Sequence, residues 1–310
     1  MTTLDLVVTA VDDSVPDVRS LTMARPNGGT LPSFTPGSHI VVQCGGAANA
    51  YSLTGDSVQP TQYEISVLEL PDGAGGSRWI HALEVGDPVS VLPPRSGFAP
   101  IQRARKHLLI AAGIGVTPMV SHLRSARQWG REVELFYLHR PGRGAHLDDI
   151  AALTDAARIF TQRADFLAVL PDVLSTQPLG AHLYICGPTT FIDDVVAAAV
   201  DSGWPQSRIH LERFGVGALD PGEPFTVKLA NSGTTIAVES GVSLLEALEA
   251  NGHEIPNLCR QGVCGECRLT VSSGEVLHRD MYLTDADKAA GDAIMACVSR
   301  AASSELELKL

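Results

Sequence analysis

Four of the six cysteines are spaced as ligands of an iron–sulfur cluster. Cys259, Cys264 and Cys267 fall within nine residues, and Cys297 follows downstream. This is the plant-type pattern C-x4-C-x2-C…C, in which four thiolates hold a [2Fe-2S] cluster. Soft, anionic thiolates suit a sulfide-bridged iron pair because they spread its charge. A four-cysteine zinc site is the alternative, but such sites usually carry two C-x2-C pairs, and this chain has one.

Two glycines in the same stretch, Gly262 and Gly265, would let the chain wrap a cluster and point backbone N–H groups at sulfur. The isolated Cys44 is typical of an ordinary buried thiol. The chain opens without the basic and apolar stretch of a signal peptide. We therefore expect a cytoplasmic protein whose clustered cysteines bind a cofactor rather than form disulfides.

Two glycine-rich turns lie where a buried strand is expected to lead into a helix, at residues 111–119 and 186–188. Glycines there allow close approach of a nucleotide pyrophosphate, and a helix N-terminus adds N–H groups and positive potential. Either turn alone could be purely structural. Together they would meet at one edge of a parallel sheet, where doubly wound folds bind ligands. The candidate NAD(P)H-binding residues are Gly113, Gly115, Thr117, Pro118, Cys186, Gly187 and Pro188.

The adenosine end of the nucleotide has its own candidates. His139, Arg140 and Arg143 follow the second strand of this region, where a ribose 2′-phosphate would be read. Arginine there could favour NADPH, stack on adenine or point to solvent. We therefore expect NADH by default and leave NADPH open.

The elements that position these residues fall into three regions. Residues 1–100 show short alternating strands between Gly- and Pro-rich turns, typical of an antiparallel β-barrel. Residues 101–215 alternate strands with helices, which predicts an α/β doubly wound parallel sheet. A linker at residues 216–223 leads into residues 224–310, which open with a hairpin and a capping-box helix. The expected barrel strands are residues 4–11, 39–43, 63–69 and 88–92, and the expected helices of the second region are residues 118–129, 146–157 and 188–202.

Composition narrows the possible partners. The 310-residue chain is 45% apolar and has a formal net charge of −12. This charge disfavours nucleic acid and anionic membranes, and no apolar run approaches the roughly 20 residues of a membrane span. An acidic surface suits docking on a basic patch of another protein, or serves solubility alone.

Taken together, the motifs resemble the phthalate dioxygenase reductase family over essentially the whole chain. The match rests on residues 50–53, 75–77 and 212–215, on the two glycine-rich turns and on the cysteine loop. The resemblance implies a multidomain protein with a flavin barrel, a nicotinamide domain and a C-terminal α+β ferredoxin domain of β-grasp type. It also implies FMN, a monomer, and electron delivery to a separate terminal oxygenase, commonly of the Rieske non-haem iron type. The flavin-site residues that it implies are Asn49, Tyr51, Ser52, Leu53, Val67, Leu68, Gly75, Gly76, Ser77 and Phe214.

The resemblance also implies individual roles. Tyr51 would pack on the flavin ring, Ser52 would hydrogen-bond near its N5 atom, and Phe214 would cover the ring. Thr117 would touch both flavin and nicotinamide, and Cys186 would lie by the nicotinamide. Thr117, Phe214 and Cys186 are therefore the catalytic candidates. Tyr51 and Phe214 could instead be plain core aromatics.

Two positions depart from the family pattern. Asn49 and Glu69 stand where the family has arginines that usually neutralise the FMN phosphate. The remaining phosphate partners would be the N–H groups of residues 75–77 and the side chain of Arg78. Because losing a charge-assisted partner costs roughly 1.5–3 kcal/mol, we predict weakly held, easily lost FMN or a different flavin form.

The chemistry that follows is electron transfer. A hydride carries two electrons and a [2Fe-2S] cluster accepts one, so a flavin, stable in three redox states, is needed to divide the pair. We therefore expect an NAD(P)H-dependent reductase component of a multicomponent oxygenase. A cytochrome P450 or another haem protein as acceptor is one alternative, and a redox-sensing module without turnover is another.

Overall fold

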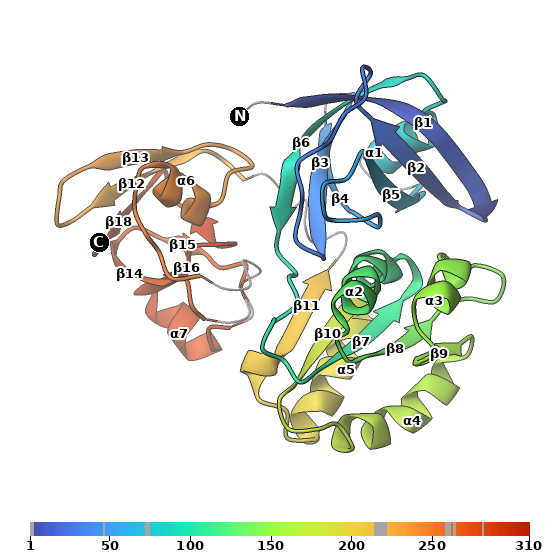
Figure 1. Cartoon of the computed structure of the whole chain (residues 1–310). Helices are drawn as coiled ribbons and strands as arrows, with labels where there is room; N and C mark the ends of the chain where they lie inside the picture. The colour runs from blue at the N-terminus through green and yellow to red at the C-terminus, as the bar shows by residue number, and fades with distance from the viewer. Residues whose placement is uncertain are drawn as a thin grey trace. The chain divides into compact units, whose positions relative to one another are not determined.

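The computed structural model in Figure 1 describes residues 3–45, 47–71, 75–213, 222–257, 262, 265–280 and 282–310. The chain divides into two compact units, Met1–Gly217 and Ala218–Leu310. Among the described residues, no helix combines the length and the apolar character needed to cross a membrane.

The N-terminal unit begins with a closed antiparallel barrel. Its elements are β1 (Leu4–Val15), β2 (Val18–Ala24), β3 (Ser38–Cys44), β4 (Ala47–Ser52), β5 (Gln62–Leu68), α1 (Gly76–His81) and β6 (Pro88–Ser96). The strands follow the order β4-β3-β6-β1-β2-β5. An antiparallel bridge between Leu53 and Ile65 joins the two edges of this sheet, so the sheet closes on itself. Alternate strand positions, such as Ile40 and Val42 of β3, fill the core.

Two barrel strands were not predicted. In β2 the buried residues Val18, Leu21 and Met23 do not alternate evenly, and its pairing with β1 contains register shifts. β4 consists largely of small and polar residues, so it lacks the apolar pattern of a strand. The other four strands were predicted within a few residues of their ends.

The second half of this unit is a parallel sheet with helices packed against it. Its elements are β7 (Lys106–Ala112), η1 (Gly113–Gly115), α2 (Val116–Trp129), β8 (Val133–Leu138), α3 (Leu147–Leu153), β9 (Ala157–Phe160), α4 (Arg163–Ser175), β10 (Ala181–Gly187), α5 (Thr189–Asp201), η2 (Gln206–Arg208) and β11 (Ile209–Arg213). The strand order β11-β10-β7-β8-β9 confirms the predicted doubly wound arrangement. Almost every residue of β7 is buried, as expected of a central strand in a parallel sheet.

Helix prediction in this half was incomplete. α4 was missed because Pro171 lies inside it, and proline usually ends a helix. The helix expected at residues 146–157 is shorter, because α3 spans only Leu147–Leu153 before β9 begins.

The C-terminal unit is an α+β domain, which agrees with the predicted ferredoxin fold. Its elements are β12 (Phe225–Leu229), β13 (Thr235–Val238), α6 (Leu244–Ala250), β14 (Arg268–Ser273), β15 (Val276–Leu277), α7 (Asp285–Ala290), β16 (Ala293–Met295), β17 (Arg300–Ala301) and β18 (Glu305–Leu308). The main sheet has the order β13-β12-β18-β14-β16, with β12 parallel to β18. The predicted hairpin is β12–β13. The predicted capping box is confirmed too, with the amide of Glu246 donating to Ser243 Oγ at 3.1 Å.

Candidate functional site

The two glycine-rich turns meet at one edge of the parallel sheet. β7 and β10 are neighbours, with Ala111 paired to Cys186, and each strand runs directly into its turn. A Cβ added at Gly115 would lie 2.4 Å from the carbonyl oxygen of Cys186. The Thr117 side chain is buried, and its hydroxyl donates to the carbonyl of Ile114 at 3.0 Å. The fold therefore produces the close backbone approach that a dinucleotide pyrophosphate requires at such a turn.

Three buried polar side chains gather next to these turns. Cys186 of β10 is paired with Glu212 of β11, and Ser52 lies at the end of β4, close enough to Glu212 to influence the ionisation of its carboxyl. Burial raises the pKa of Glu212 to about 8, and the Ser52 hydroxyl offsets only part of this shift. Burial, and then the Glu212 carboxylate, raise the pKa of the Cys186 thiol.

This group of side chains has unused hydrogen-bonding capacity. Within the described part of the chain, neither Ser52 Oγ nor Glu212 Oε2 makes a hydrogen bond of normal geometry, although both atoms are buried and the two side chains are close. Buried polar atoms normally find partners, so two such atoms beside the nucleotide turns fit a site completed by the polar edge of a flavin or nicotinamide. The family resemblance implied Ser52, and the second glycine-rich turn indicated Cys186. Glu212 was not predicted as a site residue, because it was included only within the matching segment 212–215. An acidic residue inside a buried strand is itself an indication of a functional site.

The residues expected at the flavin phosphate also lie together. A Cβ added at Gly76, the first residue of α1, would lie 1.9 Å from Asn49 Nδ2, so the Asn49 amide packs directly on the start of this helix. The same Nδ2 donates to the Tyr51 hydroxyl at 3.4 Å, and burial raises the pKa of Tyr51. Ser77 Oγ accepts a hydrogen bond from the amide of Leu70 at 3.0 Å.

The strand opposite this helix has less capacity left for a ligand. Val67 contributes its side chain to the barrel core, and its carbonyl lies 2.8 Å from His81 Nε2. Leu68 follows it with a partly buried side chain. Glu69 lies 4.0 Å from His81 Nδ1 and is half-exposed. The acidic replacement at position 69 thus lies beside a histidine of α1.

The structure separates the three adenosine candidates. His139 is buried, and its Nδ1 lies 2.8 Å from the Arg140 carbonyl. One ring nitrogen of His139 is therefore engaged by the protein backbone. The Arg140 side chain is exposed. Arg143 forms an ion pair with Asp17 at the β1–β2 turn of the barrel.

The cysteine loop is described in part. Cys259 and Cys264 lie outside the described residues, as does Phe214. Cys267 and Cys297 are buried, and the amide of Ala296 donates to the Cys267 carbonyl at 3.1 Å, which holds the two cysteine segments side by side. The amide of Gly262 donates to Cys297 Sγ at 3.2 Å, which is the kind of N–H···S contact expected from the sequence.

Both loop glycines occupy conformations that favour glycine. Gly262 and Gly265 have φ values of +73° and +84°. An added Cβ would lie 2.5 Å from Val298 at the first position and 2.3 Å from the Tyr282 ring at the second. Buried thiols, an N–H donor to sulfur and a tightly wound backbone fit a [2Fe-2S] cluster.

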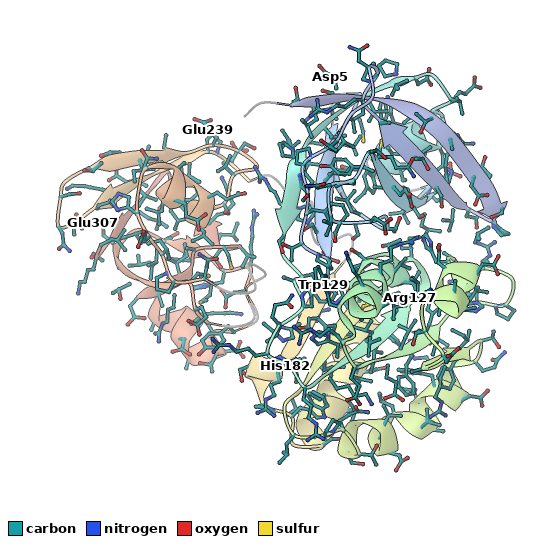
Figure 2. All side chains as sticks on the ribbon, viewed as in Figure 1. Asp5, Arg127, Trp129, His182, Glu239 and Glu307 are labelled. Atoms are coloured by element: carbon teal, nitrogen blue, oxygen red, sulfur yellow. The ribbon has the colours of Figure 1, made fainter. Side chains whose placement is uncertain are left out.

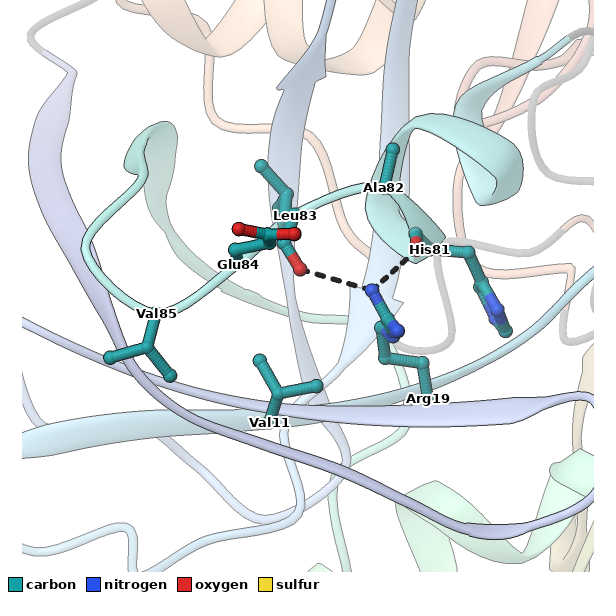
Figure 3. Close-up of a pocket in the computed structure, with 7 residues that line it drawn as sticks. All are labelled: Val11, Arg19, His81, Ala82, Leu83, Glu84 and Val85. Carbon is teal, nitrogen blue, oxygen red and sulfur yellow. Dashed lines mark hydrogen bonds between the residues drawn. The ribbon is translucent and has the colours of Figure 1, made fainter.

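A surface hollow on the barrel lies beside His81, and no described residue of the nucleotide turns or the cysteine loop lines it. Figure 3 shows that Arg19 lines this hollow and donates to the carbonyls of His81 and Leu83. The hollow measures about 360 Å³. Arg19 is also paired with Asp13 at 2.7 Å, so its donors serve the barrel itself.

Several histidines that looked scattered in the sequence gather around Tyr184. His182, labelled in Figure 2, has its Nδ1 2.9 Å from His210 Nε2, and the His210 ring stacks on Tyr184. The buried His122 contacts the same tyrosine. Burial lowers the pKa of His210 to about 4 and that of His122 to about 3. These rings are therefore neutral packing groups at ordinary pH.

Comparisons with known proteins agree with this arrangement. A family profile described as "Dimethylamine monooxygenase subunit DmmA-like, N-terminal domain" matches residues 87–209, and one described as "2Fe-2S iron-sulfur cluster binding domain" matches residues 227–302. The heme-dependent oxidative N-demethylase beta subunit of Ectopseudomonas mendocina is 38% identical, and the alignment covers 100% of this chain and 99% of that protein.

Two solved structures are similar to this chain over almost its whole length. Phthalate dioxygenase reductase, described as a modular structure for electron transfer from pyridine nucleotides to [2Fe-2S], is 35% identical with a TM-score of 0.66, and covers 99% of this chain and 98% of its own. An intact type IV self-sufficient cytochrome P450 monooxygenase is 32% identical with a TM-score of 0.70 over 99% of this chain, which corresponds to 41% of the P450 chain.

Proposed function

This chain belongs to the phthalate dioxygenase reductase family, and from that premise we propose how its residues divide the work. It is an NAD(P)H-dependent flavin and iron–sulfur oxidoreductase, the reductase subunit of an oxygenase system. We assign residues 1–100 to flavin binding, residues 101–215 to NAD(P)H, residues 216–223 to a linker and residues 224–310 to the cluster.

One observation carries this proposal. The buried polar atoms of Ser52 and Glu212 lie beside Cys186, where the barrel meets the two nucleotide turns. These residues would hold a flavin, which would supply the means to take a hydride as an electron pair and pass its electrons on singly. Ser52 would hydrogen-bond the ring, while Thr117 and Cys186 would hold the nicotinamide against it. No acid or base is required of the protein for this step.

The remaining assignments follow the same division. Tyr51 would pack on the flavin ring and Phe214 would cover it. The residues proposed to complete the flavin site are Asn49, Leu53, Val67, Leu68, Gly75, Gly76 and Ser77, those for NAD(P)H are Gly113, Gly115, Pro118, His139, Arg140, Gly187 and Pro188, and those for the cluster are Cys259, Cys264, Cys267 and Cys297.

Electron transfer from the [2Fe-2S] cluster to a Rieske-type acceptor would be energetically favourable. Plant-type clusters lie near −400 mV and Rieske centres at about −150 mV or above. A drop of roughly 250 mV corresponds to about 6 kcal/mol for one electron. We propose a monomeric reductase in the cytoplasm that uses NADH by default and docks on such an oxygenase.

An anaerobic titration with NADH tests the proposal. We expect the visible absorbance of the purified protein, with FMN added, to bleach in both its flavin and its cluster bands. NADPH should require a higher concentration for the same bleaching. Protein that contains zinc in place of iron and acid-labile sulfide, or cluster absorbance that NADH leaves unchanged, would contradict it.

A haem protein is the second candidate acceptor. The 38% identical relative is a subunit of a heme-dependent N-demethylase, and a similar module forms part of a self-sufficient P450. Coupled assays with one purified Rieske oxygenase and one haem-dependent oxygenase separate the two acceptors. The true partner should draw electrons at low micromolar concentration with substrate oxidised in proportion to NADH consumed.

A further inference from the structure

We propose that four side chains, Ser66, His146, Asp149 and Arg124, position the nicotinamide half of the N-terminal unit on the flavin barrel. We call this set the polar latch. The inference rests on the proposed function, because it concerns the geometry in which nicotinamide meets flavin. None of the four residues lies in the nucleotide turns or in the cysteine loop, so they are positioning residues and not catalytic ones.

The barrel end of the latch is a pair of serines. Ser20 of β2 and Ser66 of β5 are register partners, and their hydroxyl oxygens are 2.7 Å apart. Ser66 is buried, with 5% of its surface exposed. Its hydroxyl also lies 2.9 Å from His146 Nε2, which belongs to the nicotinamide half. The latch therefore crosses from one half of the unit to the other through a shielded hydrogen bond.

His146 has an uncommon backbone conformation. It is the N-cap of α3 with φ +60° and ψ +25°, a left-handed geometry that glycine or asparagine adopts more readily. Non-glycine residues remain there when surrounding contacts hold them. The contacts here are side-chain ones, because Nδ1 lies 2.8 Å from Asp149 Oδ2 while Nε2 meets Ser66. The hydrogen bonds of its ring to Asp149 and Ser66 thus explain why a histidine occupies this position.

Arg124 completes the latch from α2. Its Nη2 donates to Asp149 Oδ1 at 3.0 Å, and its Nε donates to the carbonyl of Thr54 at 2.8 Å. Thr54 is buried and lies two residues after Ser52. Because α2 begins at the first nucleotide turn, Arg124 connects the helix of that turn to the chain segment that carries Ser52.

The hydrogen bonds of the latch form in either protonation state of the histidine. With neutral His146, Nδ1–H donates to Asp149 and Nε2 accepts from Ser66, whose oxygen accepts from Ser20 in turn. With protonated His146, Nε2–H donates to Ser66, which then donates to Ser20. The serine hydroxyls rotate to suit each case, so the chain of hydrogen bonds is complete in both.

A hydrogen-bonded serine, histidine and aspartate also form the catalytic triad of many hydrolases. The surroundings of Ser66, His146 and Asp149 indicate a positioning role instead. The Ser66 hydroxyl is buried and already contacts both Ser20 and His146. The Asp149 carboxylate is shared between His146 and Arg124, and its contacts with these two side chains, above all the hydrogen bond from His146, lower its pKa. Two contacts thus cross between the halves, Ser66–His146 and Arg124–Thr54, and Asp149 joins His146 to Arg124 behind them.

The expected consequence is on hydride transfer. A misplacement of about 1 Å between reacting groups can lower a rate about a hundredfold. The latch fixes α2 and α3 against β2, β5 and the segment at Thr54, and so sets the distance and angle at which a nicotinamide on the turn approaches a flavin on the barrel. Breaking it should lower the rate of that step more than it weakens nucleotide binding.

The test uses the full-length protein loaded with FMN and cluster. The variants are Asp149→Asn and His146→Asn, the second of which keeps a residue that tolerates the left-handed backbone. The matched control is Asp194→Asn, which breaks the Arg163–Asp194 ion pair between α4 and α5 within one half. In stopped-flow experiments at saturating NADH, both latch variants should reduce flavin at least about tenfold more slowly. Their Michaelis constant for NADH should stay within about twofold, and their nicotinamide–flavin charge-transfer absorbance should be weaker.

A second measurement does not depend on activity. Unfolding by urea of wild type, Ser66→Ala, Asp149→Asn and the double variant should give non-additive midpoints, because both residues act through His146. Additive midpoints, or flavin reduction at the wild-type rate in either latch variant, would overturn the proposal. Wild-type protein whose flavin NADH never reduces would defeat the proposed function instead, while the Ser66–Asp149 coupling would still report on the latch.

Discussion

The carbonyl oxygen of Cys186 occupies the space that a side chain at Gly115 would need. A Cβ at Gly115 would lie only 2.4 Å from this oxygen and 2.7 Å from the amide nitrogen of Gly187. Both contacts are with backbone, which cannot rotate away as a flexible side chain could. The close approach of the two nucleotide turns therefore depends on glycine at position 115.

Gly115→Ala should weaken NADH binding by forcing these turns apart. We expect the Michaelis constant for NADH to rise at least about tenfold, because a backbone displacement at the pyrophosphate removes contacts throughout the cofactor. Gly130→Ala, at the far end of α2, is the matched control, since its φ of +61° is strained but nothing lies within 4 Å of the added Cβ. NADH-dependent ferricyanide reduction measures both variants. Equal Michaelis constants in the two would contradict this reading of the turns.

Gly262→Ala should empty the cluster site while leaving the flavin half intact. The added Cβ meets Val298 at 2.5 Å and would displace the amide that donates to Cys297 Sγ. We expect iron and acid-labile sulfide to fall below half of the wild-type content, with NADH-dependent ferricyanide reduction retained. Gly252→Ala carries a similar left-handed strain at φ +83° in open space, and should keep its cluster. A fully loaded Gly262→Ala protein would refute the importance of this contact.

Glu212→Gln should change how stability depends on pH. The pKa of Glu212 is about 8 in the folded protein against an ordinary value of 4.5, so the folded chain holds a proton that the unfolded chain releases above pH 4.5. Stability therefore falls as pH rises from about 4.5 to 8, by a few kcal/mol at most. In thermal melts at pH 5 and pH 8, the melting temperature of the variant relative to that of wild type should be higher at pH 8 than at pH 5. The exposed Glu239→Gln, labelled in Figure 2, should show no such gain.

The fold was predictable where apolar patterning and special residues coincide. Residues 108–112 of β7 form an unbroken apolar run and the Ser243–Glu246 capping box marks the start of α6, and both were found as expected. β4 and α4 were not, because β4 is held by its neighbours despite a weak strand pattern and α4 tolerates Pro171. In both cases tertiary packing overrides local propensity.

The site was predictable only as far as local motifs reach. Glycine spacing identified the turn at Gly115, and cysteine spacing identified the cluster loop. The environment of Glu212 depends on its burial beside Ser52 of another domain half, and the ring contacts of His146 join residues 80 positions apart. Such relationships come from the packing of distant segments, which no single stretch of sequence encodes.

Asn49→Arg should strengthen FMN binding. Asn49 packs on Gly76 at the start of α1, so an arginine there would bring a permanent charge to the N–H groups proposed to hold the phosphate. A charge-assisted hydrogen bond adds roughly 1.5–3 kcal/mol, which corresponds to about one to two decades in the dissociation constant. Fluorescence titration of flavin-depleted protein measures this constant, and the gain should shrink as salt is raised because the attraction is screened. Asn49→Gln adds length without charge and should leave the affinity near that of wild type. Wild-type protein that retains stoichiometric FMN through extensive washing would contradict this prediction. So would an Asn49→Arg variant that binds FMN no more tightly than the Asn49→Gln variant.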